Sequence, residues 1–265
     1  MAERIVTRLF VEPDLTTGVS VTLSADHAHF LRAVLRLSPG AKLALFNGRD
    51  GEWLAALESI GKKQASVIVL EQRREQQPSH PLRLVFAPVK KGPMDFLIQK
   101  SVELGVTDLH PVATARTQGD RLKEDRIRAQ CIEAAEQCER LDVPAVHSLQ
   151  KLESFLDDWP ENIPLFVCAE AGEAEPLPKV LQAQDREKLL VSGNGLMTGP
   201  EGGFSAEELV FLRKRPFVTL VGLGPRILRA ETAAVAGLTI WQAIIGDMAE
   251  RPPLRWSIFE LGDQS

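Results

Sequence analysis

The sequence predicts an α/β protein in two parts: a small β-barrel at the N-terminus and, behind it, an α/β domain with a parallel sheet. Two observations carry this prediction. Residues 1–75 consist mainly of short alternating or β-branched runs separated by turn residues, which is typical of a small barrel. After Pro81, patterns of buried strands and amphipathic helices alternate, which indicates parallel strands with helices on both faces of the sheet.

The barrel is predicted to contain five strands and one helix. The helix spans Asp26–Leu37, with Ser24 as its N-cap and an apolar stripe between Phe30 and Leu35. A polar, proline-flanked segment, Glu71–Pro81, predicts a linker to the second domain, residues 76–265. The strands are predicted at Thr7–Val11, Val21–Ser24, Lys42–Asn47, Gly51–Ile60 and Gln64–Gln72.

The second domain is predicted to continue the alternation to its last helix. That helix is apolar around nearly its whole circumference, which predicts burial in a core or in a dimer interface. Ser205 and Glu208 form a capping box at the start of the preceding helix. The strands are predicted at Leu82–Val89, Asp108–Ala113, Pro164–Ala169, Lys188–Ser192, Gly195–Thr198 and Phe217–Val221, and the helices at Pro93–Leu104, Glu124–Arg140, Ser205–Lys214 and Ala230–Met248.

Composition limits the class of protein. The chain has 265 residues, 44% hydrophobic and 25% charged, which is typical of a globular protein and too apolar for a disordered one. Three cysteines are too few for a disulfide framework or a four-ligand zinc site, and no metal is expected. The sequence shows no membrane-spanning apolar run and no secretory leader, so we expect a cytoplasmic protein with no membrane partner.

Two glycine-rich loops are the clearest candidates for a ligand site. They are TGPEGGFS at residues 198–205 and GLGPRILRAETA at residues 222–233, and each follows a predicted strand and opens a helix. Ligands of open α/β sheets bind outside the carboxyl ends of strands, where glycine lets the backbone approach closely. Neither loop matches a dinucleotide fingerprint or a phosphate loop. The alternative is that both are tight turns only.

This pair of loops resembles the RsmE family, the 16S ribosomal RNA uridine-N3 methyltransferases of the SPOUT group. Three further segments are similar to the family: HAHFLRAVLR at 27–36, KSVELGV at 100–106, and AAEQCER at 134–140 followed by Val143-Pro144. The chain departs from the family at SGNG, residues 192–195, an additional glycine-rich bend. The resemblance implies a PUA-like barrel, a trefoil-knotted SPOUT domain, S-adenosyl-L-methionine as cofactor, a homodimer, and 16S rRNA in the assembled 30S ribosomal subunit as substrate.

The resemblance also implies roles for individual residues. Uridine N3 carries a proton at neutral pH, so a group must remove it or stabilise the anion that forms. Arg229 is the candidate for stabilising that charge, and Glu201 or Glu231 for accepting the proton. Arg229 equally fits a structural ion pair, and Glu231 a first-turn carboxylate that favours the helix dipole. Backbone contacts to the cofactor are implied for Thr198, Gly199, Glu201, Gly202, Leu220, Gly222, Leu223, Ile227 and Leu228.

Charge is divided unequally between the two parts. Residues 1–75 hold 10 Lys and Arg against 9 Asp and Glu, whereas the whole chain has a net charge of −5. This balance excludes coating of RNA by charge alone but allows a local basic face to bind one site. Two alternatives stay open: a knotted methyltransferase for another rRNA or tRNA base, and a non-catalytic RNA-binding module. The RNA-binding candidates are Arg8, Arg32, Arg36, Lys90, Lys91, Gln137 and Arg140.

Overall fold

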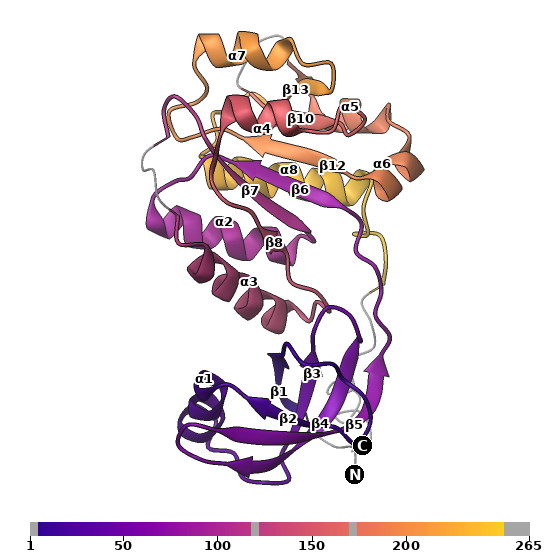
Figure 1. Ribbon diagram of the computed structural model, residues 1–265. Coiled ribbons are helices and arrows are strands. Elements are labelled where there is room, and N and C mark those ends of the chain that lie inside the picture. The colour runs from indigo at the N-terminus through magenta and orange to yellow at the C-terminus, as the bar shows by residue number, and fades with distance from the viewer. Residues whose placement is uncertain (1–4, 118–121, 170–173, 252–265) are drawn as a thin grey trace, which may run out of the picture. The chain divides into compact units, whose positions relative to one another are not determined.

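The computed structural model describes residues 5–117, 122–169 and 174–251, which fold into two compact units (Figure 1). The first unit comprises the chain up to Pro78 together with Ala135–Asp142, and the second comprises 79–134 and 143–250. Residues 135–142 therefore join the first unit, although the sequence predicts one boundary near residue 75. The end of the predicted second domain, residues 252–265, lies outside the described residues.

The first unit is a five-stranded sheet around one apolar core. The strand order is β1–β3–β4–β5–β2, with β1 parallel to β3 and the other pairs antiparallel. Leu9, Leu45 and Val67 are among the side chains that fill the core. β5 continues to Arg74, so the predicted linker starts later than Glu71. The strands are β1 (Ile5–Phe10), β2 (Ser20–Leu23), β3 (Lys42–Phe46), β4 (Glu52–Ile60) and β5 (Ala65–Arg74).

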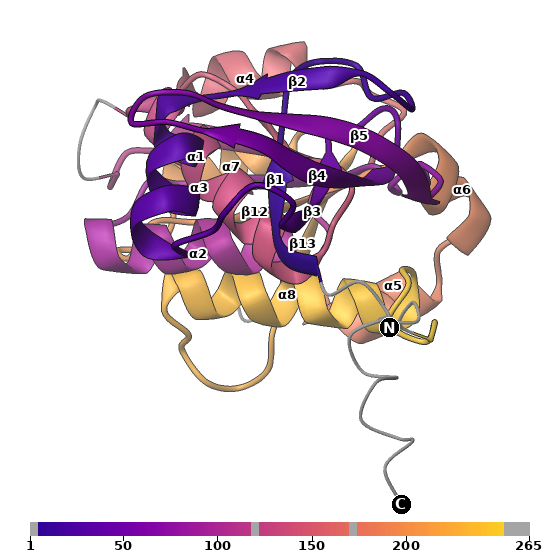
Figure 2. The ribbon, with the colours of Figure 1, turned by 90° about the horizontal axis from the view of Figure 1, so that it is seen from below.

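The predicted helix of this unit is divided into two short pieces at one end of the strands (Figure 2). They are α1 (Ala25–His29) and a π-helical turn, η1 (Phe30–Val34). Ser24 caps α1 as predicted, because its hydroxyl accepts a hydrogen bond from the backbone N–H of His27 at 3.1 Å. Arg36 has φ +54°, a left-handed conformation that ends the helical segment before Leu37.

Arg8 holds the end of α3 (Glu124–Cys138) against the strands of the first unit. Its Nε lies 2.6 Å from a Glu52 carboxylate oxygen, and its guanidinium stacks 4.4 Å above the Phe46 ring. The last carbonyls of a helix lack partners within the helix, and a cation there also favours the helix dipole. The Nη groups of Arg8 donate to the carbonyls of Ala135, Glu136 and Arg140 at 3.0, 3.3 and 2.9 Å.

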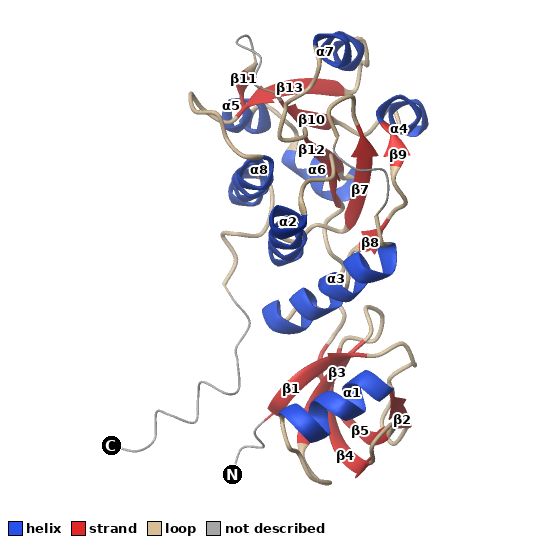
Figure 3. Ribbon diagram, turned by 90° about the vertical axis from the view of Figure 1, so that its left-hand side faces the viewer, coloured by secondary structure: helices blue, strands red, loops and turns tan. Residues whose placement is uncertain are grey.

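The second unit is a parallel sheet with helices on both faces. The strand order is β11–β13–β10–β12–β6–β7–β8, and β9 also pairs with β7. Figure 3 shows α2, α5 and α8 along one face and α4 and α7 along the other. The strands are β6 (Leu82–Phe86), β7 (Asp108–Ala113), β8 (Ala145–Val146), β9 (Gln150–Lys151), β10 (Leu165–Cys168), β11 (Glu175–Pro176), β12 (Asn194–Thr198) and β13 (Val218–Gly222).

The helices of the second unit agree with the sequence except in the middle of the domain. The capping box of Ser205 and Glu208 is present at α7. Two short helices, α4 and α5, were not predicted, because each has only one or two turns. The helices are α2 (Lys91–Glu103), α4 (Leu152–Asp158), α5 (Leu177–Gln182), α6 (Arg186–Ser192), α7 (Ala206–Arg213) and α8 (Ala230–Ile244). Among the described residues, no helix has the length and apolar character needed to cross a membrane.

The strand predicted at Lys188–Ser192 is wrong, because this segment forms α6. The side chain of Asp185 accepts a hydrogen bond from the backbone N–H of Lys188 at 3.1 Å and caps the helix. Gly193 ends it with φ +79° and ψ 178°, a conformation that is essentially restricted to glycine. The glycine-rich bend at 192–195 is therefore the end of α6 and the start of β12.

We expect Gly193→Ala to destabilise the second unit strongly. The new β-carbon would lie 2.7 Å from the Pro81 carbonyl oxygen and 2.6 Å from an Arg83 nitrogen, in addition to the backbone strain. Strain and overpacking together should lower the free energy of unfolding by about 2–5 kcal/mol, measured by urea denaturation. Gly92→Ala is the matched control, since a β-carbon there meets nothing within 4 Å. Equal stability of the two variants would contradict this account of the bend.

Helix α8 is buried on one side only. It lies beside α2 and α5 (Figure 2) and buries Leu238 and Trp241 against the rest of the unit. The prediction that it is buried all round is therefore not met within one chain, because Thr232 and Ala243 are exposed and Ile240 is half-buried. The residues that the structure describes leave one apolar side of α8 uncovered.

Candidate active site

The two glycine-rich loops leave the sheet at the same edge. Cys168, the last residue of β10, is paired in parallel register with Thr198 of β12 on one side and with Val221 of β13 on the other. The loops that follow β12 and β13 therefore emerge with only β10 between them. Because all three strands point the same way, their carboxyl ends form the edge at which open α/β sheets bind ligands.

The first loop, residues 198–205, is held by contacts from a third strand end. Arg116, in the loop after β7, donates to the carbonyl of Gly202 at 2.6 Å. The buried Glu208 carboxylate accepts from the backbone N–H groups of Ala115 and Ser205, at 2.7 and 2.8 Å. Sequence reasoning missed Arg116, which lies 86 residues from Gly202 and carries no motif that points to it.

The backbone of both loops faces open space at one glycine each. Gly203 has φ +67° and Gly224 has φ +103°, and a β-carbon at either position would meet no atom within 4 Å. These glycines are required by conformation and not by crowding. Ile227, in the second loop, is 84% exposed, which is unusual for a large apolar side chain. The loops therefore offer a bare backbone and an uncovered apolar side chain.

The last residues of β12 and β10 are a buried threonine, Thr198, and a half-buried cysteine, Cys168. The Thr198 hydroxyl is buried and has no hydrogen-bond partner among the described residues. Most buried polar groups are hydrogen-bonded, so this one requires an explanation. Burial raises the pKa of the Cys168 thiol to about 12, so this cysteine stays a neutral thiol and not a nucleophile.

The residues predicted to stabilise the uracil anion or to accept its proton lie in these loops and in the helix that follows. Arg229 is the N-cap residue of α8 and is exposed, Glu201 is exposed in the first loop, and Glu231 is half-buried in the first turn of α8. Over the described ranges, none of the three side chains makes a hydrogen bond or an ion pair. The alternative of a structural ion pair for Arg229 therefore finds no partner here.

The residues predicted to contact RNA are divided between the two units. Arg32 and Arg36 are exposed in the first unit, and Lys90 and Lys91 are exposed where α2 begins in the second. Gln137 is also exposed. Two others are engaged in the fold: the donors of Arg8 bind Glu52 and helix carbonyls, and Arg140 Nε lies 3.0 Å from an Asp142 oxygen. Arg8 and Arg140 therefore have structural contacts in place of free guanidinium groups.

Known proteins resemble the chain in both sequence and fold. A family model described as an RNA methyltransferase domain matches residues 75–242, and one described as an RNA methyltransferase PUA domain matches residues 23–70. Ribosomal RNA small subunit methyltransferase E of Rickettsia conorii is 31% identical over 232 residues, covering 87% of this chain and 93% of the relative. The protein of the same name from Bacillus subtilis is 28% identical, covering 88% and 94%.

Two solved structures share the fold over nearly the whole chain. A crystal structure of ribosomal RNA small subunit methyltransferase E from Neisseria gonorrhoeae, bound to S-adenosylmethionine, has a TM-score of 0.79 and 29% identity and covers 91% of this chain and 99% of that one. A methyltransferase from Legionella pneumophila, also with bound S-adenosylmethionine, has a TM-score of 0.78 and 30% identity, with coverage of 91% and 98%.

Proposed function

Because this chain belongs to the ribosomal RNA small subunit methyltransferase E family, we propose that it methylates N3 of a uridine in 16S rRNA, with S-adenosylmethionine as the methyl donor and the assembled 30S subunit as substrate. The observation that carries the proposal is the emergence of both glycine-rich loops at one edge of the sheet, on either side of β10. The trefoil knot typical of the family is proposed to run through these loops. Such an enzyme acts where ribosomal subunits are assembled, in the cytoplasm.

The residues at this edge fit an adenosyl cofactor. Gly203 and Gly224 present backbone to open space, and the unpartnered hydroxyl of Thr198 supplies a buried polar group for a ligand. When bound, S-adenosylmethionine supplies an electrophilic methyl group on a positively charged sulfur. The backbone groups proposed to hold it are those of Thr198, Gly199, Glu201, Gly202, Leu220, Gly222, Leu223, Ile227 and Leu228.

The Thr198 hydroxyl allows the cofactor site to be tested without disturbing the fold. We expect Thr198→Val to weaken S-adenosylmethionine binding by about tenfold, since one net hydrogen bond is worth roughly 1–1.5 kcal/mol. Isothermal titration calorimetry measures this change. The melting temperature of the cofactor-free protein should stay equal or rise, because the substitution removes a buried, unpaired hydroxyl. Unchanged affinity with raised stability would show that the hydroxyl does not serve the cofactor.

The chain's own residues are proposed to manage the charge of the uracil. Removal of the N3 proton places negative charge on the ring and its carbonyls, and a positioned cation stabilises such charge. Arg229 fits this role because it is exposed, without a partner over the described ranges, and next to the positive end of the α8 dipole. Glu201 or Glu231 is proposed to accept the proton, since both carboxylates belong to the same pair of loop segments.

Exposed basic residues on each unit are proposed to contact RNA. In the first unit these are Arg32, within the η1 turn, and Arg36, just after it, and in the second they are Lys90 and Lys91. All four are exposed and have no partner among the described residues, so their charges are available to phosphates. Gln137 is a further candidate contact. Arg8 is left out because its guanidinium is used within the fold.

A homodimer is proposed to cover the open side of α8. The buried side of this helix packs within the unit, whereas Val235 and Ile240 are only half-buried and Ala243 is exposed. A helix that is apolar on both sides is normally covered on both. Sedimentation of the purified protein at twice the monomer mass supports this proposal, and a monomer at micromolar concentration contradicts it.

Transfer of labelled methyl groups tests the proposed function. Purified protein is incubated with S-adenosylmethionine carrying a tritiated methyl group and with 30S subunits, free 16S rRNA or tRNA. We expect label in 30S subunits that were isolated from cells lacking the gene. Preferential labelling of tRNA would favour a methyltransferase for another base. Tight binding to 30S subunits without transfer would favour a non-catalytic RNA-binding module.

A further inference from the structure

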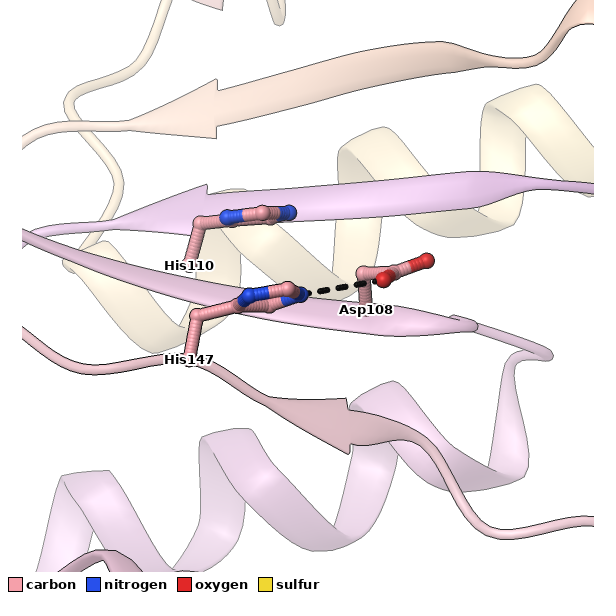
Figure 4. Close-up of side chains that lie close together, drawn as sticks. All are labelled: Asp108, His110 and His147. Atoms are coloured by element: carbon pink, nitrogen blue, oxygen red, sulfur yellow. Dashed lines mark hydrogen bonds and ion pairs between the residues drawn. The ribbon is translucent and has the colours of Figure 1, made fainter. Parts of the chain in front are cut away.

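A cluster of three potential metal ligands lies on the second unit, away from the glycine-rich loops. Asp108 and His110 are alternate residues of β7 and therefore point to the same face of the sheet, and His147 follows β8. The donor atoms of the three side chains all lie within 4.8 Å of one another. Figure 4 shows both imidazole rings with one nitrogen directed to the side where the Asp108 carboxylate lies.

The pairing of strands explains why these residues meet. β8 pairs with β7 at Asp108 and Leu109, and β9 resumes the pairing at Val112 and Ala113. The ladder is interrupted between these two positions, and His147 lies in the gap beside His110. The two rings stack with their centroids 3.9 Å apart, and His147 Nε2 lies 3.0 Å from an Asp108 oxygen.

His110 has one imidazole nitrogen that makes no hydrogen bond and could bind a metal ion. Its Nε2 is buried and has no hydrogen-bond partner among the described residues. Burial, together with the neighbouring His147, lowers the pKa of His110 to about 4, so its imidazole is neutral at pH 7 and keeps a free lone pair. Burial alone would raise the pKa of Asp108, but hydrogen bonds from His147 and Thr107 hold it below its usual value. Asp108 is therefore a carboxylate.

We propose that Asp108, His110 and His147 bind a first-row divalent cation, with Zn²⁺ as the best match. Two imidazoles and one carboxylate are a ligand set that Zn²⁺ accepts, with the fourth position of a tetrahedron left to water. Zinc–ligand bonds of about 2.1 Å place tetrahedral ligands about 3.4 Å apart, so donor atoms within 4.8 Å of one another need to close by at most about 1.4 Å. The two stacked rings, now 10° from parallel, also have to tilt so that one nitrogen of each points at the ion. On binding, the cation takes the place of the proton on His147 Nε2 that faces Asp108, and that proton moves to Nδ1 of the same ring, so His147 stays a neutral ligand.

The site is structural and independent of the proposed methyl transfer. Asp108 is the first residue of β7, whereas the glycine-rich loops follow the last residues of β12 and β13. A cation held here would fasten the 145–151 segment to β7 across the interrupted ladder. The positive charge of Arg83 also acts on His110, and the negative charge of Asp108 acts in the opposite direction. The sequence predicts no metal, because 37 residues separate the two histidines and only strand pairing unites them.

Titration of the full-length, metal-free protein with Zn²⁺ tests the proposal. We expect one Zn²⁺ per chain and a melting temperature that rises with Zn²⁺ concentration. His147→Ala and Asp108→Asn should each weaken binding by at least about tenfold. His80→Ala is the matched control, because His80 is an exposed histidine of the same unit with no partner among the described residues.

Replacement of Zn²⁺ by Co²⁺ provides a readout of coordination itself. We expect visible absorption bands typical of four-coordinate Co²⁺, present in the His80→Ala variant and lost in His147→Ala. Absence of these bands, or binding that is equal in all variants, would overturn the proposal. Because no step of methyl transfer is involved, this result stands whether or not the protein methylates RNA.

Discussion

Arg229→Ala should lower the rate of methyl transfer by about 100- to 1,000-fold while leaving the affinity for S-adenosylmethionine unchanged. The guanidinium is exposed at the start of α8 and makes no contact that the fold depends on. Its proposed task is to stabilise charge that develops on the uracil only as N3 is deprotonated. Single-turnover kinetics with 30S subunits measure the rate, and calorimetry with the cofactor alone measures the affinity.

A second variant at this position separates charge from shape. Arg229→Lys keeps the positive charge but loses the planar, two-pronged donor, so we expect only part of the rate to return. Arg213→Ala is the control, since Arg213 is an exposed arginine of the same unit, at the end of α7, with no partner over the described ranges. Loss of cofactor affinity in parallel with the rate would instead make Arg229 a cofactor-binding or folding residue.

Arg8→Ala should destabilise the first unit by about 3–5 kcal/mol, the cost of breaking a buried ion pair from one side. The side chain of Arg8 is only 9% exposed, and its removal leaves the Glu52 carboxylate, 11% exposed, with Arg74 as a more distant partner at 3.8 Å. It also removes the donors to the carbonyls of Ala135 and Glu136 in α3 and of Arg140 just after it. Urea denaturation followed by far-ultraviolet circular dichroism measures the change.

The sequence predicts that Arg8 binds RNA, so the control must distinguish RNA binding from stabilisation of the fold. Arg32→Ala removes an exposed arginine of the same unit, and we expect it to reduce binding to 30S subunits with no change in stability. If the Arg8→Ala protein is stable but binds 30S subunits poorly, Arg8 contacts RNA as the sequence predicts. An unstable one would confirm that its guanidinium serves the fold.

Most elements of the fold could be predicted because their signals are local. The capping box of Ser205 and Glu208 and the turn signals between strands of the barrel fix where elements start and stop. The strand prediction for residues 188–192 is wrong because a short apolar run is compatible with a strand and with a helix. Asp185, which caps the start of the helix, and Gly193, which ends it, decide for the helix.

The candidate site can be predicted only where its residues belong to one continuous segment of the sequence. Each glycine-rich loop is one segment, and the rule for parallel sheets predicts that such loops meet. Contacts between distant segments were not predictable: Arg116 reaches Gly202, and His147 reaches Asp108, only through the order of strands in the sheet. Arg8 shows the same limit, since its partners in α3, Ala135 and Glu136, lie 127 and 128 positions away.

The most direct test of the central claim is to map N3-methyluridine in small-subunit rRNA from a strain that lacks the gene. Methylation at N3 blocks base pairing, so reverse transcriptase stops at the modified uridine. We predict no stop in the mutant rRNA and one new stop after its 30S subunits are treated with the purified protein and S-adenosylmethionine. A mark that is present without the gene, or that the protein and cofactor do not restore, would contradict the account.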